Sequence, residues 1–188
     1  PGAGTIIGVE VVTKSAPDGY TLMVTNNSIA VNHTLYPKLP YDTLKDVTPI
    51  IKAGSTPNVL LVHPSLPVKA TKELVVLLKS KPDQIAYSSA GTGSTSFLAA
   101  ELFKLLAGVR MLHVPYKGTA PALTSILSGE TQVAITALPA AVAHIKGGRL
   151  RALGVTSAQR ATGMKELPTL TDSIEHIYAL TSAWTFSA

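Results

Sequence analysis

The stretch that decides the fold, Ile85–Val114, reads IAYSSAGTGSTSFLAAELFKLLAGVRMLHV. It opens with a short apolar strand and continues into Gly91–Ser96, a loop made only of Gly, Ser and Thr. Leucines then recur at helical spacing through Phe97–Ala107, and Gly108 is suited to the left-handed cap that ends a helix. Another apolar strand follows, so the stretch predicts a strand–helix–strand unit.

The same alternation extends on both sides of this stretch. Short apolar runs bounded by Pro or Gly predict strands, and apolar residues every three or four positions predict helices. This rhythm is typical of an α/β fold whose mainly parallel sheet carries helices on both faces. The other expected elements are a helix over 8–16, a strand over 20–25, a strand over 58–63, a helix over 71–80, strands over 85–88 and 109–114, a helix N-capped by Thr119 and ending at Gly129, a strand over 132–136, a helix over 139–145, a strand over 151–156, a short helix after residue 169 and a strand over 179–186.

The alternation of expected strands and helices also predicts the domain organisation. Residues 63–156 contain a full set of alternating elements and are expected to form a complete α/β lobe. The flanks, 1–62 and 157–188, lack enough elements for a domain each. Together they are expected to form another lobe, which would be incomplete in this chain.

Composition narrows the class of protein. Of the 188 residues, 46% are hydrophobic and 14% charged, as in a globular protein with a substantial core. No apolar run approaches the roughly 18 residues that cross a bilayer, so no direct membrane insertion is expected. The net charge of +5 is spread along the chain and aromatic residues make up only 5%, which argues against nucleic acid as a partner.

The spacing of residues in this chain matches no motif for catalysis, metal binding or cofactor binding. The chain has no cysteine, and its five histidines stand too far apart for a metal-ligand pattern. Gly91 and Gly93 begin like a dinucleotide fingerprint, but Ser96 stands where the third glycine is needed. No catalytic residue, metal ligand or cofactor is therefore expected, and the protein is not expected to be an enzyme.

The loop Ser88–Ser96 is a candidate binding element. It precedes a helix start, where backbone N–H groups lack partners inside the helix and the helix dipole favours an anion. Gly91 and Gly93 permit close approach of a ligand to the backbone, and the following hydroxyls add donors. The residues are equally consistent with a simple capping turn.

Short sequence motifs along the whole chain resemble those of a known family. In this order they resemble the Bug-type (TctC-type) solute-binding receptors of tripartite tricarboxylate transporters. The motifs are Pro1-Gly2-Ala3-Gly4 with Gly8, Ala16–Leu22 (APDGYTL), Leu35–Asp42 (LYPKLPYD), Pro57–Leu60 (PNVL), Tyr87–Gly91 (YSSAG), Glu101–Phe103 (ELF), His113–Gly118 (HVPYKG), Pro121–Leu123 (PAL), Arg151–Leu153 (RAL) and Leu167–Thr169 (LPT).

The resemblance implies a type II periplasmic-binding-protein fold, with two α/β lobes and a ligand cleft between them. It implies a periplasmic receptor that captures a di- or tricarboxylate, an aromatic acid or an amino acid and delivers it to the membrane subunits of the transporter. Compared with the family pattern, the chain looks like a fragment that lacks both ends, including any signal peptide. A ligand-sensing module for a signalling partner, or an enzyme on the same fold, are the alternative functions.

The resemblance also implies the site residues, which are expected to face each other across the cleft. Asn and Ser side chains can donate hydrogen bonds to a carboxylate, with an Asx-type turn at 26–28 as the alternative interpretation. The family's frequent pocket carboxylate is absent from Ala134–Ala137. The implied ligand-binding residues are Asn26, Asn27 and Ser28 in lobe one, and Ala90, Gly91, Thr92, Gly93, Ser94, Ser96 and Thr136 in lobe two.

Overall fold

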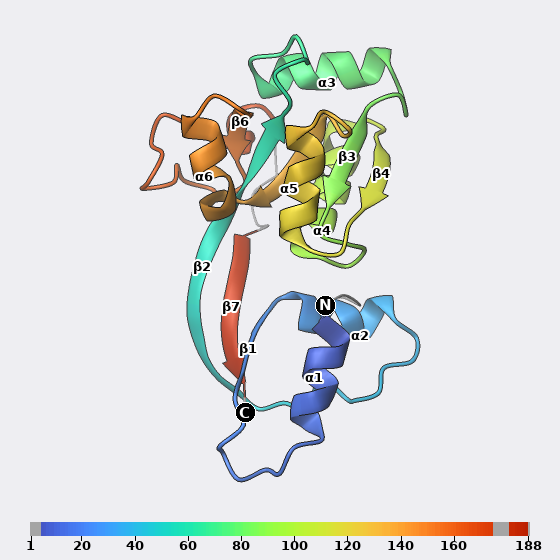
Figure 1. Cartoon of the computed structure of the whole chain (residues 1–188), viewed down its shortest axis with the longest axis vertical. Coiled ribbons are helices and arrows are strands. Elements are labelled where there is room, and N and C mark those ends of the chain that lie inside the picture. Colours follow the sequence, from blue (N-terminus) through green and yellow to red (C-terminus); the bar gives the residue numbers. More distant parts are fainter. Residues whose placement is uncertain (1–4, 175–180, 188) are drawn as a thin grey trace. The chain divides into compact units, whose positions relative to one another are not determined.

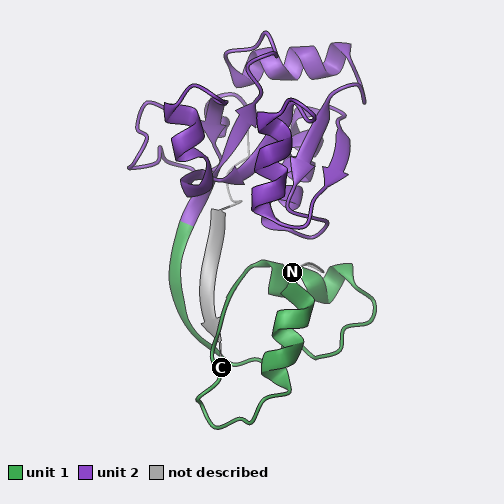
Figure 2. Ribbon diagram, in the orientation of Figure 1, with its two compact units in different colours: residues 1–55, 182–188 green, residues 56–181 purple. Residues whose placement is uncertain are grey.

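The fold is that of a computed structural model, which describes residues 5–174 and 181–187. Among these residues, none of the helices combines the length and the apolar character that crossing a membrane requires. The described chain divides into two compact units, residues 1–55 with 182–188 and residues 56–181 (Figure 2). The sequence places these boundaries elsewhere, near 62/63 and 156/157.

The larger unit is built on a mixed sheet (Figure 1). Strand β3 pairs in parallel with β4 and β5, whereas β2 lies between β5 and β6 and is antiparallel to both. Four strands thus share one direction, and the prediction of a mainly parallel sheet is corrected at β2. The strands are β2 (Pro49–Val62, of which residues 56–62 belong to this unit), β3 (Ala86–Ser89), β4 (Leu112–Pro115), β5 (Val133–Ala137) and β6 (Arg151–Val155).

Helices cover both faces of this sheet. Side chains alternate along β2, so that Leu60 and Val62 enter one core with α3 and α4, while Val59 and Leu61 enter the other with α5 and α6. Burial on both faces explains why this strand reads as a continuous apolar run. The helices are α3 (Thr71–Ser80), α4 (Thr95–Ala107), α5 (Thr119–Leu127) and α6 (Leu138–Lys146).

The helix boundaries follow the sequence signals closely. The predicted helix over 71–80 is confirmed as α3, and Gly108 ends α4 with φ 61° and ψ 44°, the left-handed cap that its sequence predicts. The predicted N-cap at Thr119 is wrong, because Gly118 takes that position and Thr119 is the first helical residue.

The smaller unit contains fewer elements. Helix α1 (Ile6–Thr13), strand β1 (Met23–Asn26) and helix α2 (Ser28–Leu35) share a small core around Val9, Met23 and Tyr41. Strand β1 pairs antiparallel with β7 (Thr181–Ser187), so segments from the two ends of the sequence meet in one sheet. The expected helix over 8–16 starts earlier and stops earlier, and part of the helix expected after residue 169 lies outside the described residues.

Residues after β6 complete the larger unit. The short 3-10 helix η2 (Leu170–Asp172) packs on β6, where the Val155 N–H donates to the Pro168 carbonyl at 2.9 Å. Leu170 is fully buried in the same core as Phe103 and Leu153. The segment 164–174 is therefore anchored by both backbone and side-chain contacts.

The close packing at Gly154 gives a first prediction. A Cβ atom there would lie 2.8 Å from Leu170 Cδ2 and 3.2 Å from the Pro168 carbonyl oxygen. We expect Gly154→Ala to lower the free energy of unfolding by about 1–3 kcal/mol, because the buried contact cannot give way freely. Gly163→Ala is the control, since a Cβ atom at Gly163 would have no neighbour within 4 Å. Equal denaturant midpoints for the two variants would contradict the packing described for η2.

Candidate functional site

The loop between β3 and α4 is shaped by glycines and a serine cap. Gly91 and Gly93 have φ of 119° and 80°, values that residues with a side chain rarely adopt. A Cβ atom at Gly91 would also lie 3.2 Å from the Tyr116 carbonyl oxygen. The Ser94 side chain accepts a hydrogen bond from the Phe97 N–H at 3.2 Å and so caps α4.

Several polar groups of the loop bind one another. The Ala90 N–H donates to Ser96 Oγ at 2.9 Å, and the Ser94 and Ser96 hydroxyls lie 2.9 Å apart. The Ser94 N–H donates to the Gly91 carbonyl at 3.1 Å. The Ser94 N–H is therefore engaged within the loop and is not available to bind a ligand.

A small pocket lies where the carboxyl ends of β3 and β5 meet the amino end of α5. Its free volume of about 10 Å³ has room for a single oxygen atom or water molecule. Three of the sequence-predicted site residues, Ala90, Ser96 and Thr136, line this pocket together. Its other lining residues are Ser88, Ser89, Thr119, Ala122, Leu123, Ala134 and Ile135.

The remaining predicted residues of the larger unit continue the loop beyond the pocket lining. Thr92 is exposed, Gly91 and Ser94 are half-buried, and Gly93 is buried. They belong to the same turn as Ala90 and Ser96 but do not line the pocket itself.

The predicted residues of the smaller unit sit between β1 and α2. The Asn26 side-chain oxygen accepts a hydrogen bond from the Ser28 N–H at 2.9 Å, which is the Asx turn considered above. Asn27 is the N-cap residue of α2, and Ser28 is 3% exposed. These residues therefore have a local structural role at the start of α2.

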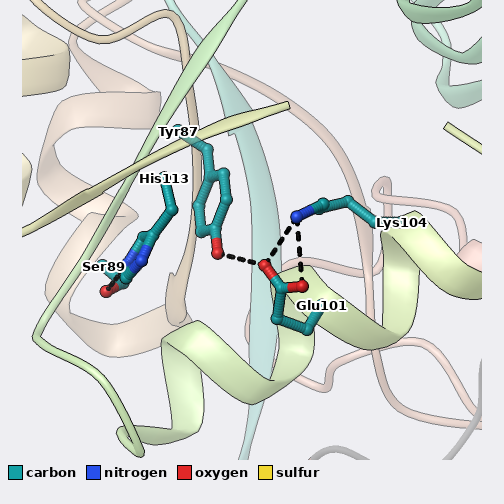
Figure 3. Close-up of polar contacts among 5 residues, drawn as sticks. All are labelled: Tyr87, Ser89, Glu101, Lys104 and His113. Atoms are coloured by element: carbon teal, nitrogen blue, oxygen red, sulfur yellow. Dashed lines mark hydrogen bonds and ion pairs between the residues drawn. The ribbon is translucent and has the colours of Figure 1, made fainter. Parts of the chain in front are cut away.

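Sequence reasoning missed a polar cluster behind the loop (Figure 3). The Tyr87 hydroxyl donates to Glu101 Oε1 at 2.5 Å, and Lys104 Nζ lies 2.8 Å and 3.0 Å from the two Glu101 oxygens. Glu101 and Lys104 are one helical turn apart on α4, a spacing that the sequence displays. Nothing in the sequence, however, placed Tyr87 beside them.

His113 joins this cluster to the loop. Its ring stacks on Tyr87 with centroids 4.8 Å apart, and the Phe97 ring lies at the same distance. His113 Nε2 is 2.7 Å from Ser89 Oγ, and Ser89 Oγ also accepts the Gly91 N–H at 3.2 Å. His113, which no spacing motif in the sequence pointed to, is thus in contact with the candidate site.

Burial and neighbouring groups shift the pKa values of Tyr87, Glu101 and His113 in this cluster. Burial and then the adjacent Glu101 carboxylate raise the pKa of the Tyr87 phenol well above its usual value, so this group stays neutral. Burial alone would raise the pKa of Glu101, but the hydrogen bonds from Lys104 and Tyr87 outweigh burial and lower it. Burial lowers the pKa of His113, which favours its neutral form at neutral pH.

The part of the chain that the structure describes contains no group of three or more His, Asp or Glu side chains placed to hold a metal ion. The candidate site is accordingly a set of hydroxyl and backbone groups at a strand-end crevice. Such a set can donate hydrogen bonds to an anionic or polar oxygen.

Comparison with known proteins gives the family. The model of the tripartite tricarboxylate transporter family receptor, TctC, matches residues 1–187. The chain belongs to the TctC family. Protein BugT of Bordetella pertussis is 37% identical over 173 residues, which cover 91% of this chain and 53% of BugT.

Solved TctC-like structures share the fold. Rpa4515 of R. palustris, solved with adipate, is 34% identical with a TM-score of 0.92, over 97% of this chain and 62% of that one. MatC of Rhodopseudomonas palustris, solved with bound malate, is 28% identical with a TM-score of 0.90, over 100% of this chain and 64% of that one. These likenesses confirm the predicted periplasmic-binding-protein fold. The chain spans about half the length of the curated relatives it matches.

Proposed function

We propose that this chain is the ligand-binding part of a periplasmic receptor that captures a small carboxylate and delivers it to the membrane subunits of a tripartite tricarboxylate transporter. The observation that carries the proposal is the pocket at the ends of β3 and β5, lined by Ser89, Ser96 and Thr136. Crevices at the carboxyl ends of strands are the usual binding positions in α/β sheets.

The chemistry of this pocket fits one end of a carboxylate. It is lined by serine and threonine hydroxyls and small apolar groups, and no Lys, Arg, Asp or Glu side chain is among its lining residues. The amino end of α4, a 13-residue helix, adds the favourable end of a helix dipole beside it. Neutral donors hold an anion without a permanent ion pair, which suits a receptor that must release its ligand.

The free volume sets how much of the ligand this pocket holds. Because it has room for a single oxygen atom, one carboxylate oxygen would enter it while the rest of the ligand lies outside. Two relatives solved with dicarboxylates, adipate and malate, support this ligand class. The loop residues Gly91, Thr92, Gly93 and Ser94, and residues Asn26, Asn27 and Ser28 of the smaller unit, stay as proposed ligand contacts.

Thermal unfolding with and without ligand tests the proposal. We expect adipate or malate to raise the melting temperature of the full-length natural polypeptide that carries this chain, whereas the corresponding uncharged diamides do not. A ligand at one hundred times its Kd stabilises the folded state by about 2.7 kcal/mol. If no di- or tricarboxylate, aromatic acid or amino acid from a broad panel shifted the melting temperature, the proposed function would be wrong.

A further inference from the structure

The pair Ser89 and His113 adjoins the proposed pocket. Ser89 is 0% exposed to solvent, and it lines the pocket from the end of β3. Its Oγ has two close polar neighbours, His113 Nε2 at 2.7 Å and the Gly91 N–H at 3.2 Å. The hydrogen-bonding capacity that Ser89 offers to a ligand is therefore decided by His113.

A serine hydroxyl has one proton to donate and two lone pairs to accept. The Gly91 N–H occupies one lone pair of Ser89. If His113 carries its proton on Nε2, it occupies the other lone pair, and the Ser89 proton is left to donate into the pocket. If Nε2 is unprotonated, the Ser89 hydroxyl donates its one hydrogen bond to His113. Only an oxygen lone pair of Ser89 is then left, and it can accept but not donate a hydrogen bond in the pocket.

We propose that His113 is a positioning residue that donates from Nε2 to Ser89, so that the Ser89 hydroxyl presents its proton to a ligand carboxylate. This inference rests on the carboxylate-binding function proposed above and assigns it a specificity determinant. A carboxylate oxygen in the pocket accepts from Ser89 and thereby selects the Nε2-protonated form of His113. A ligand group that only donates selects the opposite form and binds poorly there.

The surroundings of His113 are built to hold its ring in place. Tyr87 and Phe97 each lie with ring centroids 4.8 Å from it, and Tyr87 is in turn hydrogen-bonded to Glu101. The charged groups that act on His113 are both on α4: Glu101 favours protonation and Lys104 opposes it. Tyr87 on β3 stays neutral because its pKa is raised.

The sign of the pH dependence follows from the same geometry. The imidazolium form always carries a proton on Nε2, so a carboxylate in the pocket binds this form at least as well as the neutral one. Carboxylate affinity therefore rises as the pH falls through the pKa of His113, which burial lowers below its ordinary value of 6.5. A Gln at this position keeps an N–H donor but cannot titrate, so it removes this slope.

Calorimetric titration of adipate and malate into the full-length natural polypeptide provides the test. We expect His113→Phe, which keeps a ring but loses the donor that orients the Ser89 hydroxyl toward the ligand, to weaken binding by about two- to tenfold, the effect of losing one neutral hydrogen bond. His113→Gln should restore most of the affinity while losing the wild-type rise in affinity that occurs as the pH falls below about 6.5. In a Ser89→Ala background, His113→Phe should have no further effect, because His113 acts through Ser89.

A matched control exists elsewhere in the same unit. His63 Nδ1 lies 2.7 Å from Ser65 Oγ, in a turn beyond the end of β2 where Val62 pairs with the first residue of β5, Val133. The pocket lies at the other end of β5, so His63→Phe removes a similar hydrogen bond without touching the pocket and should leave affinity unchanged.

The nitrogen chemical shifts of the His113 ring report whether Nε2 is protonated. This test uses the wild-type protein and therefore does not depend on the stability of any variant. With adipate bound, His113 Nε2 should carry the proton. An unprotonated Nε2 in the adipate complex, or unchanged affinity in His113→Phe with wild-type binding intact, would overturn the role of His113. Absence of carboxylate binding in the wild-type protein would instead overturn the proposed function, so the two failures are distinguishable.

Discussion

Replacing Phe103 with alanine is expected to lower the free energy of unfolding by about 3–5 kcal/mol. The Phe103 side chain is 0% exposed and lies in the larger of the two cores beside the sheet, where α4 meets β3 and β5. Its removal deletes buried apolar contacts and leaves a cavity, because the strands and η2 hold the surroundings apart. Urea unfolding followed by circular dichroism measures the difference.

Leu105→Ala is the control for this prediction. Leu105 lies on the same helix two residues later but is 76% exposed, so its truncation should change stability by no more than about 0.5 kcal/mol. A loss below about 1 kcal/mol for Phe103→Ala would mean that α4 does not pack on the sheet as described.

Gly93→Val is expected to abolish carboxylate binding. Gly93 is buried in the loop before α4 and has φ 80°, a conformation that a β-branched residue adopts only under strain. A valine there would displace the loop backbone from the position that the proposed ligand contacts require. We expect at least a hundredfold loss of adipate or malate affinity, about 2.7 kcal/mol or more, by calorimetry on the full-length natural polypeptide.

Gly108→Val separates this loss from general destabilisation. Gly108 flanks the other end of α4, also has a positive φ of 61°, and a Cβ atom there would have no neighbour within 4 Å. It should cost stability through the same kind of backbone strain while leaving affinity nearly unchanged. Wild-type affinity in Gly93→Val would remove residues 91–94 from the proposed site.

Local signals predicted the elements well where one segment contains all the information. The helix over 71–80 and the left-handed cap at Gly108 follow from apolar spacing and from the tolerance of glycine for positive φ. The N-cap at Thr119 was misplaced by one residue, because Thr and Gly can both precede a helix and only the backbone path decides between them.

The candidate site could be predicted only in part. The loop 90–96 carries its own signal in its Gly, Ser and Thr composition, and Ala90, Ser96 and Thr136 do meet in one pocket. Ser89 and His113 were missed as a pair because 24 residues separate them, and only the parallel pairing of β3 with β4 brings them to 2.7 Å. The sequence displays the spacing of Glu101 and Lys104, but it did not place Tyr87 beside them, because Tyr87 lies 14 residues before Glu101 on another element.

The sequence by itself determined the α/β class, most element positions and the family, because hydrophobic periodicity, turn residues and family sequence motifs are local properties of the chain. Tertiary structure alone decided that β2 runs antiparallel between β5 and β6, that β1 pairs with β7, and that His113 reaches Ser89. Strand direction and side-chain partnership depend on which distant segments pack together. The free energy that selects those partners comes from burial shared among many segments, so no single stretch of sequence encodes it.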